Sequence, residues 1–212
     1  MTESSDKVVY MMRGLPSCGK STTARKLAGE RGLVLETDQY FYTEVGEDPT
    51  RFNYKAELME DARQWNFERF KQAVREGQRL IVVDRGNSLN LESHVYARFA
   101  ADRGYTVRLT EPDSPWWQEL KVLLKYKQVT KPVLEKWALQ LYKLSRRTHR
   151  VPISTIRRWM FRWKWNVTIE DILAYKPRND EEDELFRTYM EDDLGEPAPP
   201  KPDPVPDSTE SV

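Results

Sequence analysis

The sequence predicts an α/β fold, in which helices flank a parallel β-sheet. Short apolar runs of the buried-strand type alternate with longer stretches whose apolar residues recur at the spacing of an amphipathic helix. Strands that alternate with helices form a parallel sheet through right-handed crossovers. The expected strands are residues 7–12, 33–36, 79–84 and 105–109, and the expected helices between them are residues 21–28, 54–76 and 90–102. The 212 residues have room for one such domain with appendages.

Glycine and proline residues mark the ends of these elements. Gly77 and Gly104 follow the second and third expected helices, where glycine adopts the backbone conformation that ends a helix. Residues 44–53 contain Gly46 and Pro49 and are expected to form a loop. Beyond residue 115 the character of the chain changes, and helices are expected at residues 116–127, 131–147, 152–163 and 184–190.

A glycine-rich segment connects the first expected strand to the first expected helix. Residues 14–21 read Gly-Leu-Pro-Ser-Cys-Gly-Lys-Ser and fit the pattern of a P-loop NTPase, which is Gly, four free positions and then Gly-Lys-Ser/Thr. The glycines let successive backbone N–H groups point at phosphate oxygens, and the helix N-terminus adds its dipole. The sequence therefore predicts an ATP-binding loop formed by Gly14, Ser17, Cys18, Gly19, Lys20, Ser21 and Thr22.

Side chains in and near this loop have the types that phosphoryl transfer requires. Lys20 is expected to reach the β- and γ-phosphates, and the Ser21 hydroxyl to bind Mg²⁺. Asp84 ends the third strand, the position from which an aspartate helps to hold Mg²⁺ in such proteins. Asp38 follows the second strand, and ligands of open parallel sheets lie beyond the carboxyl ends of the strands. Asp38 is therefore a candidate general base, and the alternative is that it caps the next turn.

The net charge is zero, but the charges are unevenly distributed. Between residues 118 and 165, thirteen Lys and Arg residues face only Glu119 and Glu135. From Asp180 onward, acidic residues dominate. A basic block and an acidic tail in one chain predict either a polyanionic partner or a tail that folds over the basic face.

Tryptophans alternate with the basic residues of this block, at positions 137, 159, 163 and 165. Helical spacing favours amphipathic helices that pack their tryptophans on the sheet. A basic face with aromatic side chains also suits the binding of phosphates, either those of the nucleotide or those of a nucleic acid backbone. The two interpretations are compatible, because one helix has two faces.

The composition argues against several classes of protein. No apolar run approaches the roughly eighteen residues of a membrane span, so no membrane partner is expected. Residues 1–6 are polar and lack an apolar signal region, so a cytoplasmic location is expected. Cys18 is the single cysteine, which rules out an internal disulfide and a cysteine-based metal site and suits a reducing compartment.

Several stretches outside the phosphate loop also match the motifs of one family. They are Thr-Asp-Gln-Tyr-Phe at residues 37–41, Trp-Asn at 65–66, Asp-Arg-Gly-Asn at 84–87, Glu-Pro-Asp-Ser-Pro-Trp at 111–116, Arg-Arg-Thr-His-Arg-Val-Pro at 146–152 and Trp-Asn-Val-Thr-Ile at 165–169. Together with the loop, they resemble the polynucleotide-kinase-like P-loop kinases, which include the 5′-hydroxyl kinase of T-even phages and the kinase domain of the NEDD-binding polynucleotide kinase of animals. The resemblance covers residues 7 to about 175 and implies a phosphotransferase that uses ATP and Mg²⁺ and has an alcohol group as acceptor.

The resemblance also implies roles for residues that match the family's motifs. Asp38 would deprotonate the acceptor hydroxyl, and Arg146 would be the lid arginine that stabilises charge on the transferring group. The residues that it implies beside the substrate or in the lid are Tyr40, Arg85, Asn87, Arg147, His149 and Arg150. For His149 a structural role is the alternative. Arg85, Gly86 and Arg150 depart from the family pattern, so the substrate of the family does not transfer directly.

These observations predict the following organisation. Residues 1–6 are expected to be disordered, residues 7–177 to form a P-loop kinase domain, and residues 178–212 to form an acidic, Pro-rich, mostly disordered tail. Within the domain, residues 118–145 are expected to be a helical basic insertion and residues 146–164 a lid region. Much of the insertion has no counterpart of its length in the closer relatives of the family that the chain resembles.

The leading functional hypothesis is an ATP- and Mg²⁺-dependent kinase for a hydroxyl on a nucleic acid or nucleotide, either a 5′-hydroxyl end or a hydroxymethylated base. One alternative is a kinase for a small molecule, such as a metabolite or an antibiotic. Another is an ATP-dependent binding module without a phosphoryl acceptor. The sequence does not define the acceptor or the oligomeric state.

Overall fold

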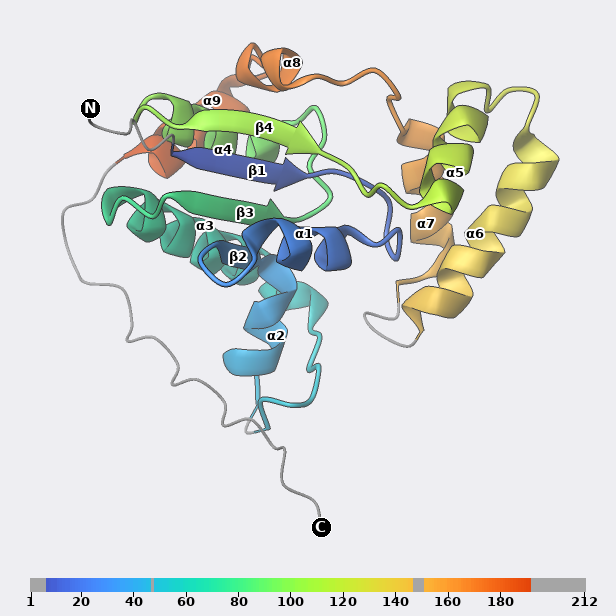
Figure 1. The fold of residues 1–212 in the computed structure, drawn as a ribbon, viewed down its shortest axis with the longest axis horizontal. Coiled ribbons are helices and arrows are strands. Elements are labelled where there is room, and N and C mark those ends of the chain that lie inside the picture. The colour runs from blue at the N-terminus through green and yellow to red at the C-terminus, as the bar shows by residue number, and fades with distance from the viewer. Residues whose placement is uncertain (1–6, 47, 147–150, 192–212) are drawn as a thin grey trace.

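The computed structural model describes residues 7–46, 48–146 and 151–191, and its centre is a parallel β-sheet (Figure 1). Its strands are β1 (Val8–Met12), β2 (Leu33–Glu36), β3 (Leu80–Asp84) and β4 (Thr106–Thr110). They lie in the order β2-β3-β1-β4, and every neighbouring pair is parallel. The predicted fold class, a parallel sheet flanked by helices, is therefore confirmed, and each strand begins within one residue of its expected start.

Helices connect the strands and follow the last of them. They are α1 (Lys20–Ala28), α2 (Tyr40–Thr43), α3 (Met59–Arg75), α4 (Leu91–Ala101), α5 (Pro115–Lys125), α6 (Lys131–Ser145), α7 (Ile153–Arg162), α8 (Ile169–Leu173) and α9 (Asp180–Met190). Two single turns of 3₁₀ helix, Thr37–Gln39 and Ala56–Leu58, precede α2 and α3. The helix expected from residue 54 therefore begins at Met59, and α8 was not predicted. Within the described ranges, no helix is long and apolar enough to cross a bilayer.

Alternate side chains of the strands are buried on opposite faces of the sheet. One face packs against α3 and α4, with a core that includes Val9, Met11, Leu35, Ile81 and Val83 from the strands and Phe67, Phe70, Val95 and Phe99 from the helices. The other face packs against α1, with Met12, Val82, Ala24 and Ala28 at its centre. This alternation follows from the period of two along a strand. Both cores fix the end of β1, where the loop to α1 begins.

Helix α9 packs on the core of the sheet domain. Phe186 stacks on the buried His94 of α4 with ring centroids 5.1 Å apart, and Tyr189 meets Phe67 edge-on at 5.2 Å. The acidic tail expected from residue 178 therefore begins with a helix that starts at Asp180, four residues earlier than the predicted one. Its apolar side chains recur three residues apart on one face, and burying that face stabilises the helix. The disorder expected for residues 1–6 and for the end of the tail concerns residues outside the described ranges.

Helices α5, α6 and α7 form a helical unit beside the sheet (Figure 1). The unit has its own hydrophobic core, which includes Trp117, Leu120, Leu124, Leu134, Ala138, Leu141, Ile156, Met160 and Trp163. Two residues of the β1–α1 loop, Leu15 and Cys18, complete this core. The helices expected in the basic block are therefore present, and they pack mainly against one another.

The expectation that the tryptophans of the basic block pack on the sheet is wrong. Trp163 is buried in the core of the helical unit, edge-on to Trp117 with ring centroids 5.4 Å apart. Trp137 is half-buried, whereas Trp159 and Trp165 are 45% and 50% exposed. Because α1, α3 and α4 already cover the sheet, the apolar faces of α5–α7 are buried against each other instead.

A buried arginine joins the helical unit to the sheet. Arg13 directly follows β1, is 1% exposed, and donates a hydrogen bond of 2.6 Å to Glu111 and another to the backbone oxygen of Lys164. Its guanidinium lies 3.8 Å from the centre of the Trp163 ring. Glu111 also pairs with Lys121 of α5 at 2.6 Å. This network holds the unit in place next to the loop between β1 and α1.

Candidate nucleotide-binding site

The loop between β1 and α1 has the backbone geometry of a phosphate-binding loop. Ser17 has a φ of 60° and Gly19 a φ of 96°, so both residues lie in the left-handed region. Such turns make successive N–H groups point into one concavity, where an anion can accept from them. Helix α1 begins at Lys20, directly after this turn, and its unpaired N–H groups add to the positive end of the helix dipole. The loop predicted from the sequence motif is thus built to hold an anion.

Only glycine fits at position 14, because the side chain of Cys18 occupies the adjacent space. A Cβ atom at Gly14 would lie 2.3 Å from Sγ of Cys18. Cys18 is fully buried and packs with Leu15 in the core of the helical unit, so Sγ has little room to withdraw. Burial also raises the pKa of the Cys18 thiol, although the nearby Lys20 opposes the rise. Cys18 therefore acts as a neutral side chain that fills the core of the helical unit.

Gly14→Ala is expected to weaken ATP binding about tenfold, because overpacking of this kind costs roughly 1–3 kcal/mol. Equilibrium binding of a fluorescent ATP analogue measures the effect. The double variant Gly14→Ala/Cys18→Ala removes the colliding sulfur and should regain part of the lost affinity, because the φ of 156° at position 14 still strains an alanine. Full affinity in the single variant, or no recovery in the double variant, would contradict the proposed packing.

The first turn of α1 supplies the side chains expected at the phosphates. Lys20 donates a hydrogen bond of 2.7 Å from Nζ to the backbone oxygen of Leu15, so its ammonium group lies within the loop. Ser21 is half-buried and Thr22 is exposed. This placement agrees with the roles expected for Lys20 and Ser21, and those roles remain predictions.

Carboxylates meet at the edge of the sheet where β2 and β3 end. Glu36 and Asp84 are register partners at the ends of these strands, and Asp38 lies in the 3₁₀ turn that follows β2. Burial raises the pKa of Glu36, and the negative charges of Asp84 and Asp38 raise it further. Glu36 was not singled out from the sequence, although its place at the end of a strand was an available signal. The three side chains make this edge strongly acidic.

This edge fits the Mg²⁺ expected at Ser21 and Asp84. Asp84 is 7% exposed, and its Oδ2 has no hydrogen-bond partner among the described residues. A buried carboxylate oxygen without a partner is costly, and a cation relieves that cost. In the described part of the chain, no three His, Cys, Asp or Glu side chains form a metal cage. Mg²⁺ is typically held by one or two carboxylates, with waters and substrate phosphates as its other ligands.

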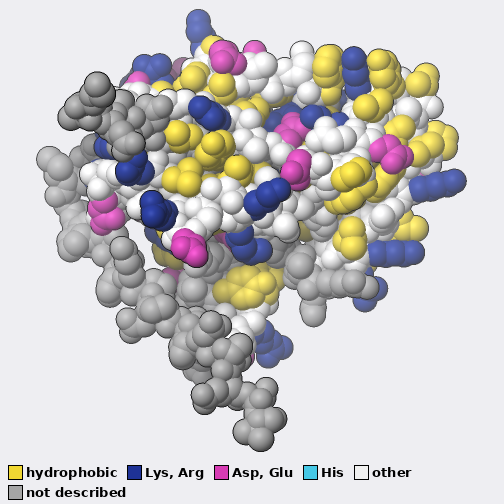
Figure 2. All heavy atoms as spheres, in the orientation of Figure 1, with side chains coloured by type: hydrophobic (Ala, Val, Ile, Leu, Met, Phe, Trp, Pro, Cys, Tyr) yellow, Lys and Arg dark blue, Asp and Glu magenta, His cyan; other side chains and the backbone are white. Residues whose placement is uncertain are grey.

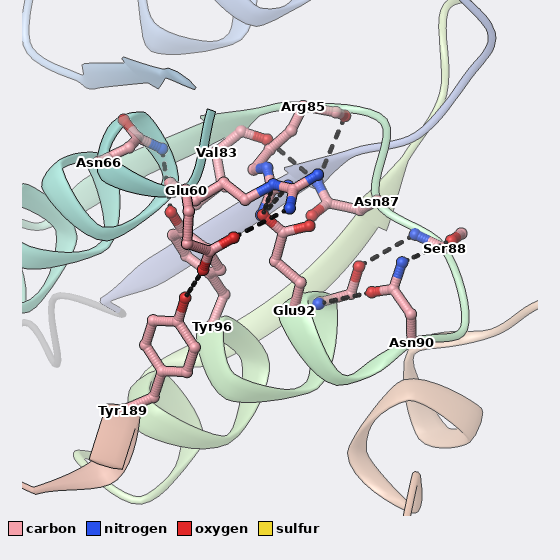
Figure 3. Close-up of polar contacts among 12 residues, drawn as sticks. Glu60, Asn66, Val83, Arg85, Asn87, Ser88, Asn90, Glu92, Tyr96 and Tyr189 are labelled. Carbon is pink, nitrogen blue, oxygen red and sulfur yellow. Dashed lines mark hydrogen bonds and ion pairs between the residues drawn. The ribbon is translucent and has the colours of Figure 1, made fainter. Parts of the chain in front are cut away.

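Asn87 braces the strand ends beneath the phosphate loop. Its side chain is buried and donates hydrogen bonds to the backbone oxygens of Met12 at 2.7 Å and Val83 at 3.3 Å. These contacts join the last residue of β1 to β3, and Figure 3 shows the side chain of Asn87 next to Val83. Its Oδ1 has no partner among the described residues, so an acceptor atom is still available there. The expected contact of Asn87 with substrate remains a prediction. Its side-chain amide also has a structural role, because it joins β1 to β3.

Arg85 points into a buried polar network. Its guanidinium pairs with Glu92 of α4 and lies 5.4 Å from the centre of the Tyr96 ring (Figure 3). Burial raises the pKa of Tyr96 to about 12, and its hydroxyl accepts a hydrogen bond of 3.0 Å from Asn66. In this arrangement Arg85 fixes the loop after β3 to α4. The expected role of Arg85 beside the substrate remains a prediction, and this guanidinium is already engaged by Glu92.

The remaining predicted residues are the ones that the family resemblance assigns to the acceptor side of the site. Tyr40 begins α2, is half-buried, and packs edge-on against Trp65 with ring centroids 5.6 Å apart. Arg146 is exposed at the end of α6. The lid residues Arg147, His149 and Arg150 lie outside the described residues. The lid and the acceptor contacts therefore remain predictions.

The parallel sheet and the loop between β1 and α1 define a P-loop nucleotide-binding protein. A family model described as an AAA domain matches residues 9–124, which is more than half of the chain. The chain therefore belongs to this family, which is P-loop kinase-like. The match ends within α5, so α6 and α7 lie beyond the part of the chain that the family shares.

The chain is also similar to a much longer human protein. NEDD4-binding protein 2 of Homo sapiens is 32% identical to it over 113 residues. These residues make up 52% of this chain but only 6% of that protein. The similarity therefore concerns one segment of the human protein.

Proposed function

We propose that this chain is an ATP- and Mg²⁺-dependent kinase that phosphorylates a hydroxyl group on a nucleic acid or nucleotide. The observation that carries the proposal is the meeting of three elements at one edge of the sheet. In the order β2-β3-β1, strand β3 lies between the other two, so Asp38 after β2, Asp84 at the end of β3 and the phosphate loop after β1 share this edge. Ligands of parallel sheets bind beyond such an edge.

Each side chain at the edge has a distinct task in this proposal. Lys20 neutralises charge on the β- and γ-phosphates, while Ser21 and Asp84 hold Mg²⁺, which supplies charge neutralisation when bound. Asp38 accepts the proton of the acceptor hydroxyl, whose oxygen bonds to the γ-phosphorus as the bond from that phosphorus to the β–γ bridging oxygen breaks. Arg146 stabilises the charge on the transferring group. Positioning and charge stabilisation supply most of the rate in such reactions.

The class of acceptor is supported by the charge of the helical unit. Eleven Lys and Arg residues lie in the described part of residues 118–165, against Glu119 and Glu135. A surface of this kind attracts polyanions and raises their association rate. A neutral metabolite would gain nothing from it, so the unit favours a nucleic acid or nucleotide acceptor over a small neutral molecule.

Transfer of label from γ-labelled ATP tests the proposal. The acceptors are an oligonucleotide with a 5′-hydroxyl end and one with a hydroxymethylated base and a blocked 5′ end, and a reaction without acceptor is run beside them. Label is expected on one of the two oligonucleotides, and the Lys20→Ala protein should not transfer it. Transfer to neither would refute the nucleic acid acceptor, and ATP turnover of equal rate without acceptor would indicate a binding module instead.

A further inference from the structure

The helical unit exposes an unusual amount of apolar surface. Among the described residues, nine of the eleven large apolar side chains that are exposed lie between residues 122 and 165. Scattered apolar side chains are normal on a protein surface, but a concentration of them on one unit marks an interaction surface. In Figure 2, hydrophobic and Lys or Arg side chains lie next to each other on the side where Figure 1 shows α5–α7. This mixture of apolar and basic side chains restricts the kind of partner.

Three exposed aromatic rings of this surface are interleaved with lysines. Phe161 is 73% exposed, Tyr126 is 52% exposed and Trp165 is 50% exposed. Lys125 places its Nζ 4.3 Å from the centre of the Trp165 ring and 5.3 Å from that of Tyr126. Lys127 places its Nζ 5.6 Å from the centre of the Phe161 ring and donates to the backbone oxygen of Phe161 at 2.6 Å. We call these five residues the aromatic–lysine strip.

The charge around the strip remains positive. Glu135, one of the two acidic residues of the unit, is paired with Arg157 at 2.9 Å. Arg158, Arg162 and Lys164 are exposed in the same part of the chain as Phe161 and Trp165. An excess of ammonium and guanidinium groups next to aromatic rings suits a ligand that combines regular negative charge with flat apolar faces.

We propose that the aromatic–lysine strip binds single-stranded nucleic acid, independently of the end or base that is phosphorylated. Unpaired bases stack on Phe161, Tyr126 and Trp165, and the phosphates between them are contacted by Lys125 and Lys127. Stacking on aromatic side chains combined with basic residues is the general way in which proteins hold single strands without reading their sequence. A duplex hides its base faces in the stack and would meet only the lysines, so single strands bind more tightly than duplexes.

Two other kinds of partner fit this strip less well. An apolar protein surface would have to desolvate the lysine ammonium groups that lie against the rings, at a large cost. Insertion into a lipid bilayer would carry the same cost, since each of the three rings has an ammonium group within 6 Å of its centre. A phosphate next to a base gives Lys125 an anionic partner and adds one to Lys127, which already donates to the backbone oxygens of Phe161 and Trp163. The charge pattern therefore favours a nucleic acid.

The inference deepens the proposed function, because it states how a polynucleotide acceptor is held away from the phosphate loop. It also concerns residues that lie outside the family match, which ends at residue 124. It can therefore be tested without any phosphoryl transfer.

The test is fluorescence anisotropy of the full chain with a 3′-labelled, 5′-phosphorylated oligothymidylate, in the absence of ATP. This probe has no 5′-hydroxyl to phosphorylate. The double variant Phe161→Ala/Trp165→Ala is expected to bind it at least about tenfold more weakly, since two stacking contacts are lost. Lys125→Gln is expected to reduce the slope of log Kd against log salt by about 0.7, the value for one phosphate contact to a single strand.

Matched control variants change an exposed aromatic residue and an exposed lysine outside the helical unit. Tyr54→Ala removes a tyrosine that is 51% exposed, and Lys55→Gln removes an exposed lysine. Both should bind the oligonucleotide as the unaltered protein does. Equal binding of single strands and duplexes, unchanged binding in the strip variants, or no binding at all would overturn the inference. Binding to vesicles of anionic lipid that the strip variants abolish, with oligonucleotide binding intact, would assign the strip to a membrane instead.

The outcome is separable from that of the kinase assay. The Lys20→Ala protein should retain oligonucleotide binding while it loses transfer. Binding without transfer in the unaltered protein would contradict the proposed function and leave the strip in place. If transfer proceeds although the strip does not bind the oligonucleotide, the proposed function stands and the inference about the strip is wrong.

Discussion

Asp38→Asn is expected to lower the turnover number for phosphoryl transfer by about 10²–10⁴, the usual contribution of a general base. The amide cannot accept the proton of the acceptor hydroxyl, but it keeps the size of the side chain in the 3₁₀ turn after β2. The KM for ATP should be almost unchanged, because the phosphate loop is not altered. Steady-state kinetics with a saturating oligonucleotide acceptor measure both constants.

Asp113→Asn is the matched control for this variant. Its carboxylate is 79% exposed and makes a long ion pair of 3.6 Å with Lys26. Turnover in this control should be within twofold of the unaltered protein, as expected for the neutralisation of an exposed side chain. If Asp38→Asn keeps turnover within the same range, Asp38 is not the base and instead caps its turn.

Arg13→Met is expected to lower the free energy of unfolding by about 3 kcal/mol, the lower end of the range for breaking a buried ion pair. The methionine fills part of the space against Trp163, but the backbone oxygen of Lys164 loses its donor. Burial lowers the pKa of Arg13, and the carboxylate of Glu111 opposes that shift by stabilising the charge. Lys121 still pairs with Glu111 in the variant, which limits the loss. Urea-induced unfolding, monitored by tryptophan fluorescence, measures the change in the free energy of unfolding.

Two further variants show whether the geometry of Arg13 matters. Arg13→Lys keeps the charge but not the planar fork that contacts Glu111 and the ring of Trp163, so its stability should be intermediate. Arg108→Met removes an exposed arginine from the neighbouring strand β4 and should change the free energy of unfolding by less than about 0.5 kcal/mol. An Arg13→Met protein as stable as Arg108→Met would show that the buried network does not hold the helical unit.

The parts of the fold that are encoded locally were predictable. The strands appear in the sequence as apolar runs, and the phosphate loop appears as a contiguous motif whose chemistry demands glycine and lysine at fixed positions. Asn90 accepts a hydrogen bond from the backbone N–H of Ser93, which explains why α4 begins where the sequence predicted. In each case, neighbouring residues carry the whole signal.

The contacts that were missed join residues far apart in the chain. Arg13 lies 98 positions from Glu111 and 151 positions from Lys164, so nothing in its neighbourhood indicates that it is buried. Arg85 and Glu92 are close in the sequence, but their pairing was missed because it depends on how the loop after β3 meets α4. Helix α8 has five residues, too few for a periodic pattern to be visible. Helical spacing predicts which face of a helix is buried, but not the element that this face packs against. The packing of the tryptophans could therefore not be derived from the sequence.

The place of Leu15 and Cys18 has a thermodynamic consequence. Both belong to the phosphate loop by sequence and to the core of the helical unit by packing. A nucleotide that binds only the folded loop stabilises everything that must be folded with it, in proportion to the logarithm of its concentration. The unfolding midpoint of α5–α7 is thus coupled to nucleotide concentration through two apolar side chains, even where these helices make no contact with a phosphate.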